Sequence, residues 1–179
     1  VSTFFEGGIV AHVAFGDPVC PSLGAVLLNA TRTVGATVHQ GGVYLCIEGP
    51  QFSTKGESRL YRQWGVSVIG MTNLPEAKLA REAELCYATV ALATDYDCWH
   101  ETEEAVTVEG ILATLRQNVM LAKQLLRTVM PAVAAVTSCS CQRSLQDAII
   151  TAPDRMPAAL RRKLALLIDR AVPVKKGTR

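Results

Sequence analysis

Asp95 and Asp97 are the residues whose type and spacing most directly suggest chemistry. They follow residues 86–93, a run of small and apolar side chains that predicts a buried parallel strand. Open α/β sheets hold their ligands beyond the carboxyl ends of such strands. A buried carboxylate is costly unless it is paired or protonated, so this pair suits a heterocycle that takes up a proton as it leaves. The alternative is a pair of exposed aspartates, since clustered acids are common in loops.

Two further loops are expected to follow strands at the same edge of the sheet. Residues 47–53 place an aromatic ring and a hydroxyl, Phe52 and Ser53, just before a predicted helix. Residues 70–76 place the Thr72 hydroxyl immediately before a helix N-terminus, which attracts anions. A ring, an anion-binding hydroxyl and two acids together suit a planar base, a phosphate and a proton transfer. Taken singly, Phe52 more often belongs to a core, and Thr72 more often only caps its helix.

Alternating strands and helices are needed to position these loops. Apolar and alternating runs predict a strand pair over residues 36–48, turning at Gly41 and Gly42, and single strands over 66–70 and 86–94. Capping residues and helical periodicity predict helices over residues 22–35, 54–64, 76–85, 108–130, 145–150 and 160–168. This order predicts an α/β fold with a mixed central sheet flanked by helices.

Local signals set the expected starts of three of these helices. Ser22 is the expected N-cap of the first helix. Thr54 and Glu57 are spaced as a capping box that opens the second. Pro75 suits the first turn of the third, because its missing N–H is not needed there.

Size and charge narrow the class of protein. The chain of 179 residues has the size of one domain and can bury a sizeable core. No apolar run approaches the roughly 20 residues that cross a bilayer, and no leader pattern is visible, so we expect a cytoplasmic protein without a membrane partner. The net charge of +2, without a basic stripe, argues against a nucleic-acid partner.

The cysteines are spread along the chain. A zinc site usually needs paired ligands at short spacings, so no metal is expected. The six thiols are Cys20, Cys46, Cys86, Cys98, Cys139 and Cys141. Most are interpreted as reduced, buried thiols. Cys139 and Cys141 stand one residue apart, and this pair could instead be redox-active or bridged.

The three loops closely resemble those of a known family, the methylthioadenosine phosphorylases. These belong to the trimeric branch of the purine nucleoside phosphorylases. The matching motifs are residues 47–53 (IEGPQFS), 70–76 (GMTNLPE) and 93–99 (ATDYDCW). The resemblance runs in register from about Thr3 to Pro131. It implies a nucleoside phosphorylase-like fold.

The family's first half has no counterpart in this sequence. That half carries a Gly-rich phosphate loop, an Arg-His pair and another phosphate-binding threonine. The resemblance therefore implies that residues 1–137 are the carboxyl-terminal part of a phosphorylase domain, with residues 138–179 a helical tail packed on it. We expect that the chain neither folds stably nor turns over substrate alone. It would act as part of a longer or split enzyme, in a homotrimer or an oligomer with an amino-terminal fragment.

The resemblance also implies a reaction and a role for each acid. The reaction would be phosphorolysis of 5'-methylthioadenosine to adenine and 5-methylthioribose 1-phosphate, with phosphate as co-substrate and no cofactor. Asp95 would bond N7 of the base and supply its proton, and Asp97 would support the 6-amino group. Relatives that use 6-oxo purines carry asparagine where this chain has Asp95, so two acids favour adenine.

Other site residues are implied in the same way. Ser53 would line the base site, and Phe52 would pack on the base or ribose. Met71 would lie under the ribose, and Thr72 would bind phosphate.

Two implied elements concern the 5' end of the nucleoside and the neighbouring subunit. Val108 and Ile111 would form an apolar wall for the methylthio group. His12 matches a residue that reaches into the neighbour's site, and its alternative is a surface loop residue. Cys20 and Cys86 could bridge, as pairs do in some heat-stable relatives, or remain two buried thiols.

Three alternative functions remain open at this point. One is a broader purine nucleoside or methylthioinosine phosphorylase. Another is a non-catalytic purine-binding subunit, which the missing phosphate half makes plausible. The third, a purely structural assembly protein, does not require a carboxylate pair.

Overall fold

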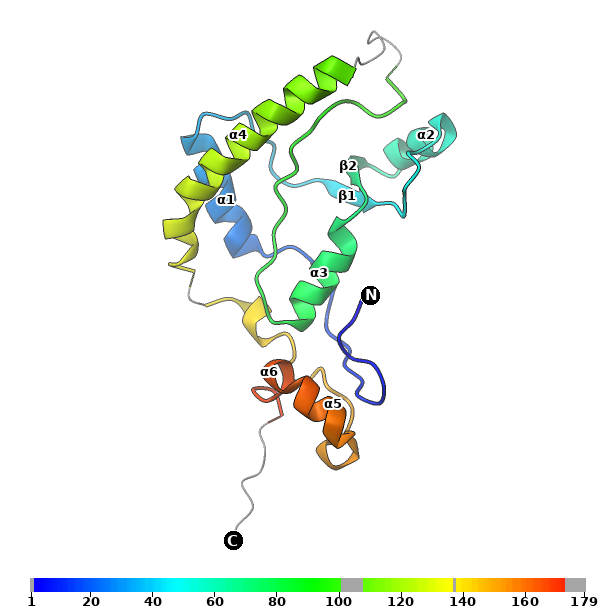
Figure 1. The fold of residues 1–179 in the computed structure, drawn as a ribbon, viewed down its shortest axis with the longest axis vertical. Coiled ribbons are helices and arrows are strands. Elements are labelled where there is room, and N and C mark those ends of the chain that lie inside the picture. The colour runs from blue at the N-terminus through cyan, green and yellow to red at the C-terminus, as the bar shows by residue number, and fades with distance from the viewer. Residues whose placement is uncertain (1, 101–107, 137, 173–179) are drawn as a thin grey trace. The chain divides into compact units, whose positions relative to one another are not determined.

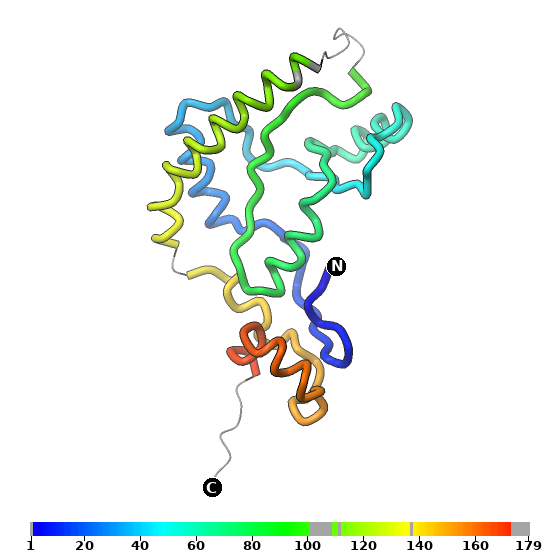
Figure 2. The backbone as a smooth tube through the Cα atoms, in the orientation of Figure 1, coloured from blue at the N-terminus to red at the C-terminus, as the bar shows by residue number. Residues whose placement is uncertain are grey.

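The computed structural model describes residues 2–100, 108–136 and 138–172, apart from the side chains of Val108 and Ile111. Figures 1 and 2 show the course of the chain. Its elements are α1 (Pro21–Thr33), β1 (Val43–Cys46), α2 (Lys55–Gln63), β2 (Val66–Gly70), α3 (Asn73–Glu82), α4 (Val108–Val133), η1 (Ser140–Arg143), η2 (Pro153–Arg155), α5 (Ala158–Lys163) and α6 (Ala165–Ile168). They form two compact units, each assembled from separate stretches of sequence.

The second unit is built from the described parts of residues 24–73 and 89–135, and it contains a parallel sheet of β1 and β2. The chain passes from β1 to β2 through α2, because parallel strands need a crossover connection. The strand predicted over residues 66–70 and the predicted α/β fold are therefore confirmed.

The strand pair predicted over residues 36–48 is wrong, since only β1 forms within it. Gly41 and Gly42 have φ angles of 82° and 100°, which are left-handed conformations that suit a turn. The strand after this turn pairs with β2 instead of folding back on residues 36–42. An alternating pattern does not distinguish a nearby antiparallel partner from a distant parallel one.

The strand predicted over residues 86–94 is also wrong, because no ladder forms there. A strand needs a neighbour for its backbone hydrogen bonds, and the sheet of the described residues contains only β1 and β2. Side chains hold the part that belongs to the second unit. The Thr89 hydroxyl donates to Asn73 Oδ1 at 2.7 Å, and Asn118 Nδ2 donates to the Ala93 carbonyl at 3.0 Å.

α1 and α4 supply the hydrophobic core of the second unit. Ala30 of α1 is buried together with Leu125 and Val129 of α4. The long amphipathic helix predicted over residues 108–130 is confirmed, and it extends to Val133.

Two helix starts differ from their predictions. α1 begins at Pro21, so Ser22 lies inside the helix instead of capping it. α3 begins at Asn73, with Pro75 in its first turn as expected. It ends before Glu84, whose φ of 56° is incompatible with a continuing helix.

The first unit has a separate core, built from the described parts of residues 1–23, 74–88 and 136–179. Its buried members are Phe5, Ile9, Leu145, Met156, Leu164 and Ile168. The helix predicted over residues 160–168 is present as α5 and α6. The domain boundary predicted at residue 137 stays a prediction.

The helix predicted over residues 145–150 is wrong. Asp147 has a φ of 64°, which interrupts any helix there. The following residues pair with the amino-terminal segment instead: His12 N–H donates to the Ala148 carbonyl, and Ile150 N–H to the Val10 carbonyl, both at 2.9 Å. A short apolar run is compatible with either a helix or an extended segment, and here the pairing with the amino-terminal segment selects the extended one.

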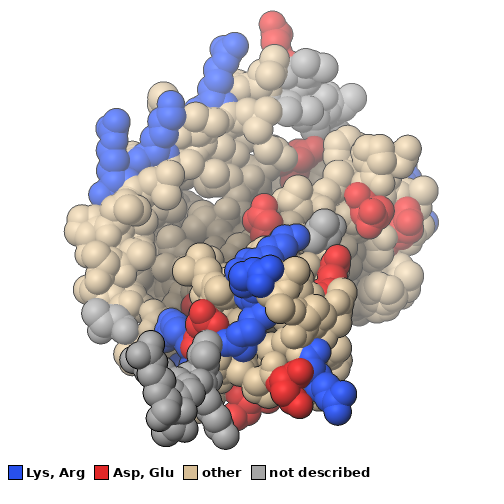
Figure 3. Space-filling view, turned by 60° about the horizontal axis from the view of Figure 1, so that its bottom comes forward, with Lys and Arg blue, Asp and Glu red and all other residues tan. Residues whose placement is uncertain are grey.

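Basic and acidic side chains are both scattered over the face that Figure 3 draws. Among the described residues, no helix is long and apolar enough to cross a membrane.

Candidate active site

The carboxyl ends of β1 and β2 lie side by side because the two strands are parallel. Cys46 is opposite Gly70, and the Ile47 N–H donates to the Gly70 carbonyl at 2.8 Å. The loop that carries Phe52 and Ser53 therefore leaves the sheet beside Met71 and Thr72. Such a strand edge is where α/β sheets bind ligands.

Gly49 brings these two loops into contact. Its φ is 72°, and a Cβ placed on it would lie 2.7 Å from the Met71 sulfur. Only glycine tolerates both this backbone conformation and this close approach. The residue therefore sets how the Phe52 loop packs against Met71.

Gly49→Ala is expected to destabilise the protein more than Gly65→Ala. Gly65 has a φ of 76° but no atom within 4 Å of the added Cβ, so it carries the backbone strain alone. Displacing Met71 adds a cost of about 1–3 kcal/mol for Gly49→Ala. Thermal unfolding of both variants measures the difference, and equal losses would contradict the contact.

α2 follows the Phe52 loop and is fixed at its start by the predicted capping box, which is confirmed. The Thr54 hydroxyl accepts from the Glu57 N–H at 3.2 Å, and Glu57 Oε2 accepts from the Thr54 N–H at 2.8 Å. The Thr54 backbone N–H, followed by its hydroxyl, lowers the pKa of Glu57. The cap orients α2 so that Ser58, one residue further, is buried.

Ser58 holds Asp97 in place. The Ser58 hydroxyl donates to Asp97 Oδ2 at 2.5 Å, and the Cys98 N–H donates to Asp97 Oδ1 at 2.8 Å. The Cys98 thiol in turn donates to the Ser53 carbonyl at 3.4 Å. Asp97 is therefore oriented by α2 and joined to the Phe52 loop.

Asp95 is less constrained than Asp97. It is exposed, and its Oδ1 accepts a hydrogen bond from the neighbouring Thr94 hydroxyl at 2.8 Å. Asp97 is half-buried. One acid is thus held from two directions, while the other faces outward and is open to a ligand.

The aromatic rings that lie near the two acids in the sequence contact one another. Tyr96 stacks on His100 with ring centroids 4.7 Å apart, and Trp99 meets His100 edge-on at 5.0 Å. The Arg62 guanidinium lies 3.6 Å from the centre of the Trp99 ring, a cation–π contact that ties the loop to α2.

The remaining predicted site residues occupy varied surroundings. Ser53 Oγ is buried and has no hydrogen-bond partner within the described part of the chain. Phe52 is 87% exposed. Thr72 directly precedes α3, as predicted, and is exposed. This loop therefore offers a ligand an exposed aromatic ring and a hydroxyl without a partner among the described residues.

Three predicted residues cannot be placed in this arrangement. The side chains of Val108 and Ile111 lie outside the described residues. His12 is exposed and belongs to the other unit.

Sequence reasoning missed Ser58, which binds Asp97, and three residues that hold the segment around the acids: Arg62 at Trp99, Asn73 at Thr89 and Asn118 at the Ala93 carbonyl. No signal distinguished Asn118, because α4 is amphipathic and carries several other polar residues. Ser58 and Arg62 lie on α2, whose many charged residues suggest a solvent-exposed helix without a role in the site.

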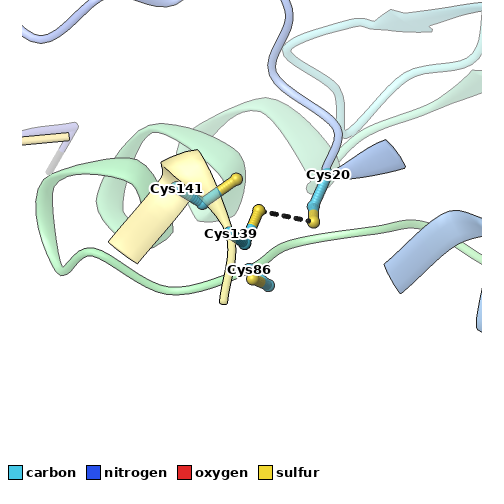
Figure 4. Close-up of side chains that lie close together, drawn as sticks. All are labelled: Cys20, Cys86, Cys139 and Cys141. Carbon is cyan, nitrogen blue, oxygen red and sulfur yellow. Dashed lines mark hydrogen bonds between the residues drawn. The ribbon is translucent and has the colours of Figure 1, made fainter. Parts of the chain in front are cut away.

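The expectation that the cysteines lie apart is wrong for four of them. The sulfur atoms of Cys20, Cys86, Cys139 and Cys141 all lie within 4.8 Å of one another in the first unit, as Figure 4 shows. All six cysteines are free thiols. Cys46 and Cys98 do not belong to this cluster.

The environment of the cluster shifts the thiol pKa values in opposite directions. The Cys141 backbone N–H is the main cause that lowers the pKa of Cys139 to about 6. Burial is the main cause that raises the pKa of Cys86 to about 12 and that of Cys141 to about 11.

The matching family model and two similar sequences of known proteins indicate the same family of proteins. Residues 1–131 match the family model described as the phosphorylase superfamily. The S-methyl-5'-thioadenosine phosphorylase of Geobacter sulfurreducens is 54% identical over 167 residues, covering 93% of this chain and 58% of the relative. That of Koribacter versatilis is 56% identical over 170 residues, covering 95% and 58%. The chain thus spans about 58% of the length of these relatives.

Solved structures agree with the sequence comparison. A methylthioadenosine phosphorylase from an antarctic soil metagenomic library has a TM-score of 0.87 at 43% identity, covering 93% of this chain and 60% of that one. The methylthioadenosine phosphorylase of Schistosoma mansoni in complex with tubercidin has a TM-score of 0.65 at 30% identity, covering 75% and 54%. The predicted resemblance and the predicted fold are confirmed.

Proposed function

We propose that this chain, which belongs to the phosphorylase superfamily, supplies the nucleoside-binding part of an enzyme that phosphorolyses 5'-methylthioadenosine. The relatives that carry this name support the substrate. The observation that carries the proposal is that Asp97 is linked through Cys98 to the Phe52 loop, and that this loop lies against Met71 at Gly49, beyond the ends of β1 and β2. The products are adenine and 5-methylthioribose 1-phosphate.

The two acids divide the work on the leaving base. A phosphate oxygen bonds to the anomeric carbon as the bond from that carbon to the purine breaks, and the electron pair passes to the purine. Asp95, which is exposed and accepts a hydrogen bond from Thr94, donates a proton to N7 and so neutralises the base. Asp97, held by Ser58 and the Cys98 N–H, accepts from the 6-amino group.

The other loops hold the rest of the substrates. Ser53 and Phe52 contact the base and ribose, and Met71 lies under the sugar. Thr72 binds phosphate at the start of α3, where the helix dipole favours an anion. Val108 and Ile111 line the methylthio pocket.

The quaternary arrangement is part of the same proposal. The subunits form a trimer, in which His12 completes the neighbouring site. Phosphate is a co-substrate, and no other cofactor is required.

We also propose that activity needs the amino-terminal part that the family has and this chain does not include. Parallel sheets are normally covered on both faces, yet Val43 and Val68 of the two-stranded sheet are 52% and 38% exposed. α4 exposes a row of apolar side chains, which line one groove together with Arg116: Leu112, Leu115, Val119 and Met120. The coverage of 58% of the relatives leaves a segment long enough to cover both surfaces.

The test is reconstitution. This chain is co-expressed with the amino-terminal part of the Geobacter sulfurreducens relative, and adenine release from methylthioadenosine is followed with and without phosphate. We expect phosphate-dependent release from this reconstituted enzyme and none from the chain alone. Binding of adenine without cleavage would instead indicate a non-catalytic subunit, and faster cleavage of inosine would indicate a broader phosphorylase.

Ser58→Ala is expected to lower kcat/KM for methylthioadenosine by about 10–100-fold, because a hydrogen bond to a charged group contributes about 1.5–3 kcal/mol. Without the Ser58 hydroxyl, Asp97 loses its hydrogen bond to α2, and its carboxylate is no longer fixed in the orientation that binds the 6-amino group. Steady-state kinetics of the reconstituted enzyme measure the change. Ser22→Ala, which alters an exposed serine inside α1, is the control, and equal kinetics for both variants would contradict the role of Ser58.

A further inference from the structure

Four thiols from three separate segments converge in the first unit. Cys20 directly precedes α1, Cys86 follows α3, and Cys139 and Cys141 flank the start of η1. The sulfur atoms of Cys20 and Cys139 are 3.4 Å apart, and all four lie within 4.8 Å of one another (Figure 4). None of these residues belongs to the site described above.

This spacing fits a tetrahedral metal ion. A Zn–S bond of about 2.3 Å places the sulfurs of a tetrahedral site about 3.8 Å apart. That separation falls between the 3.4 Å that separates Cys20 Sγ from Cys139 Sγ and the 4.8 Å limit of the whole cluster, so small side-chain movements suffice. Four sulfur ligands select zinc among the common divalent ions.

We propose that Cys20, Cys86, Cys139 and Cys141 bind one Zn²⁺ ion. All four coordination positions come from the protein, which makes the site structural and not catalytic. Its role is to join three distant segments of the first unit. The chemistry is independent of the proposed phosphorolysis.

Backbone hydrogen bonds hold the ligand-bearing segments together without the metal. The Cys20 N–H donates to the Tyr87 carbonyl at 2.7 Å, next to Cys86. The Leu145 N–H donates to Glu84 Oε1 at 3.1 Å, which links the segment after Cys141 to the one before Cys86. The site is therefore largely formed in advance.

The surroundings of the sulfur atoms are those of a thiolate site. The Leu23 N–H donates to Cys20 Sγ at 3.4 Å. Donors of this kind orient ligands and stabilise their charge. Cys20 is fully buried, and Cys141 is 3% exposed, so bulk water does not compete strongly there.

The experiment measures zinc binding directly. The protein, purified in its native assembly and fully reduced under argon, competes with a chromophoric chelator for Zn²⁺. We expect one zinc ion per chain, and X-ray absorption should show four sulfur neighbours at about 2.3 Å. Removing a residue that only hydrogen-bonds a metal ligand usually lowers metal affinity by about 10–100-fold. Cys→Ser at any of the four ligands should therefore lower zinc affinity by more than about 100-fold.

The chain supplies matched controls. Cys46→Ser and Cys98→Ser remove thiols outside the cluster and should leave zinc affinity unchanged. X-ray absorption on the unaltered protein keeps the test decisive if a ligand variant fails to fold. A reduced protein that takes up no zinc would overturn the proposal. The same holds if the purified protein contains disulfides between these cysteines and still binds no zinc once they are reduced. Because the readout is metal binding, an inactive enzyme would not affect the outcome.

Discussion

Asp95→Asn is expected to lower the turnover of methylthioadenosine by about 10²–10⁴-fold, the usual contribution of a positioned acid or base. Asparagine keeps the size of the side chain and can still accept from the Thr94 hydroxyl, but it has no proton to transfer. The purine must then leave as an anion. Because Asp95 is exposed and belongs to neither hydrophobic core of the described residues, the fold should persist. Steady-state kinetics of the reconstituted enzyme, with circular dichroism for the fold, measure both.

The control for this substitution is Asp154→Asn. Its carboxylate is 78% exposed and lies 3.8 Å from the adjacent Arg155, in the unit that does not carry Asp95. It removes the same charge without touching the base site. An unchanged kcat for Asp95→Asn would contradict proton donation by this residue. A relative gain on 6-oxo purines would support it, since an amide N–H can donate to N7 or to a 6-oxo group.

The elements that the sequence predicts well are those specified by local signals. The capping box of Thr54 and Glu57 fixes the start of α2 through bonds between residues three apart. α4 has enough turns for its apolar face to be unambiguous. β2 is bounded by Gly65 and Gly70, so its limits follow from nearby residues.

The elements that the sequence predicts wrongly depend on distant partners. Residues 86–94 have the composition of a buried strand, but a strand needs hydrogen bonds from neighbours that the described chain does not provide. Within residues 145–150, backbone groups form hydrogen bonds with Val10 and His12, and no local sequence pattern predicts this pairing. In both cases tertiary contacts outweigh intrinsic propensity.

The candidate site shows the same division. The rule that ligands bind beyond parallel strand ends placed Ser53 and Met71 near one another. Asp97 joins them through the Cys98–Ser53 hydrogen bond, although the strand predicted before it does not form. The rule could not reveal that Ser58 holds Asp97, because that contact spans 39 residues. Nor could spacing bring Cys20 beside Cys139, which are 119 residues apart.

Val119→Glu should abolish phosphorolysis by a different route, through loss of the amino-terminal part. Val119 lies in the apolar groove of α4 and is 50% exposed. If the missing part covers this groove, the new carboxylate loses its water on association, although Arg116 lines the same groove and can pair with it. Removing a charge from water in an interface costs several kcal/mol, and an ion pair formed there recovers only part of this cost. The dissociation constant should therefore rise by more than about 100-fold.

Gln124→Glu on the same helix separates this effect from charge alone. Gln124 is exposed and does not line the groove, so the same carboxylate remains in water. Sedimentation of the co-expressed pair measures association, and adenine release measures its consequence. We expect Val119→Glu to separate the two parts and lose activity, and Gln124→Glu to retain both. Equal association for the two variants would show that another surface, such as the exposed side of β1 and β2, carries the contact instead.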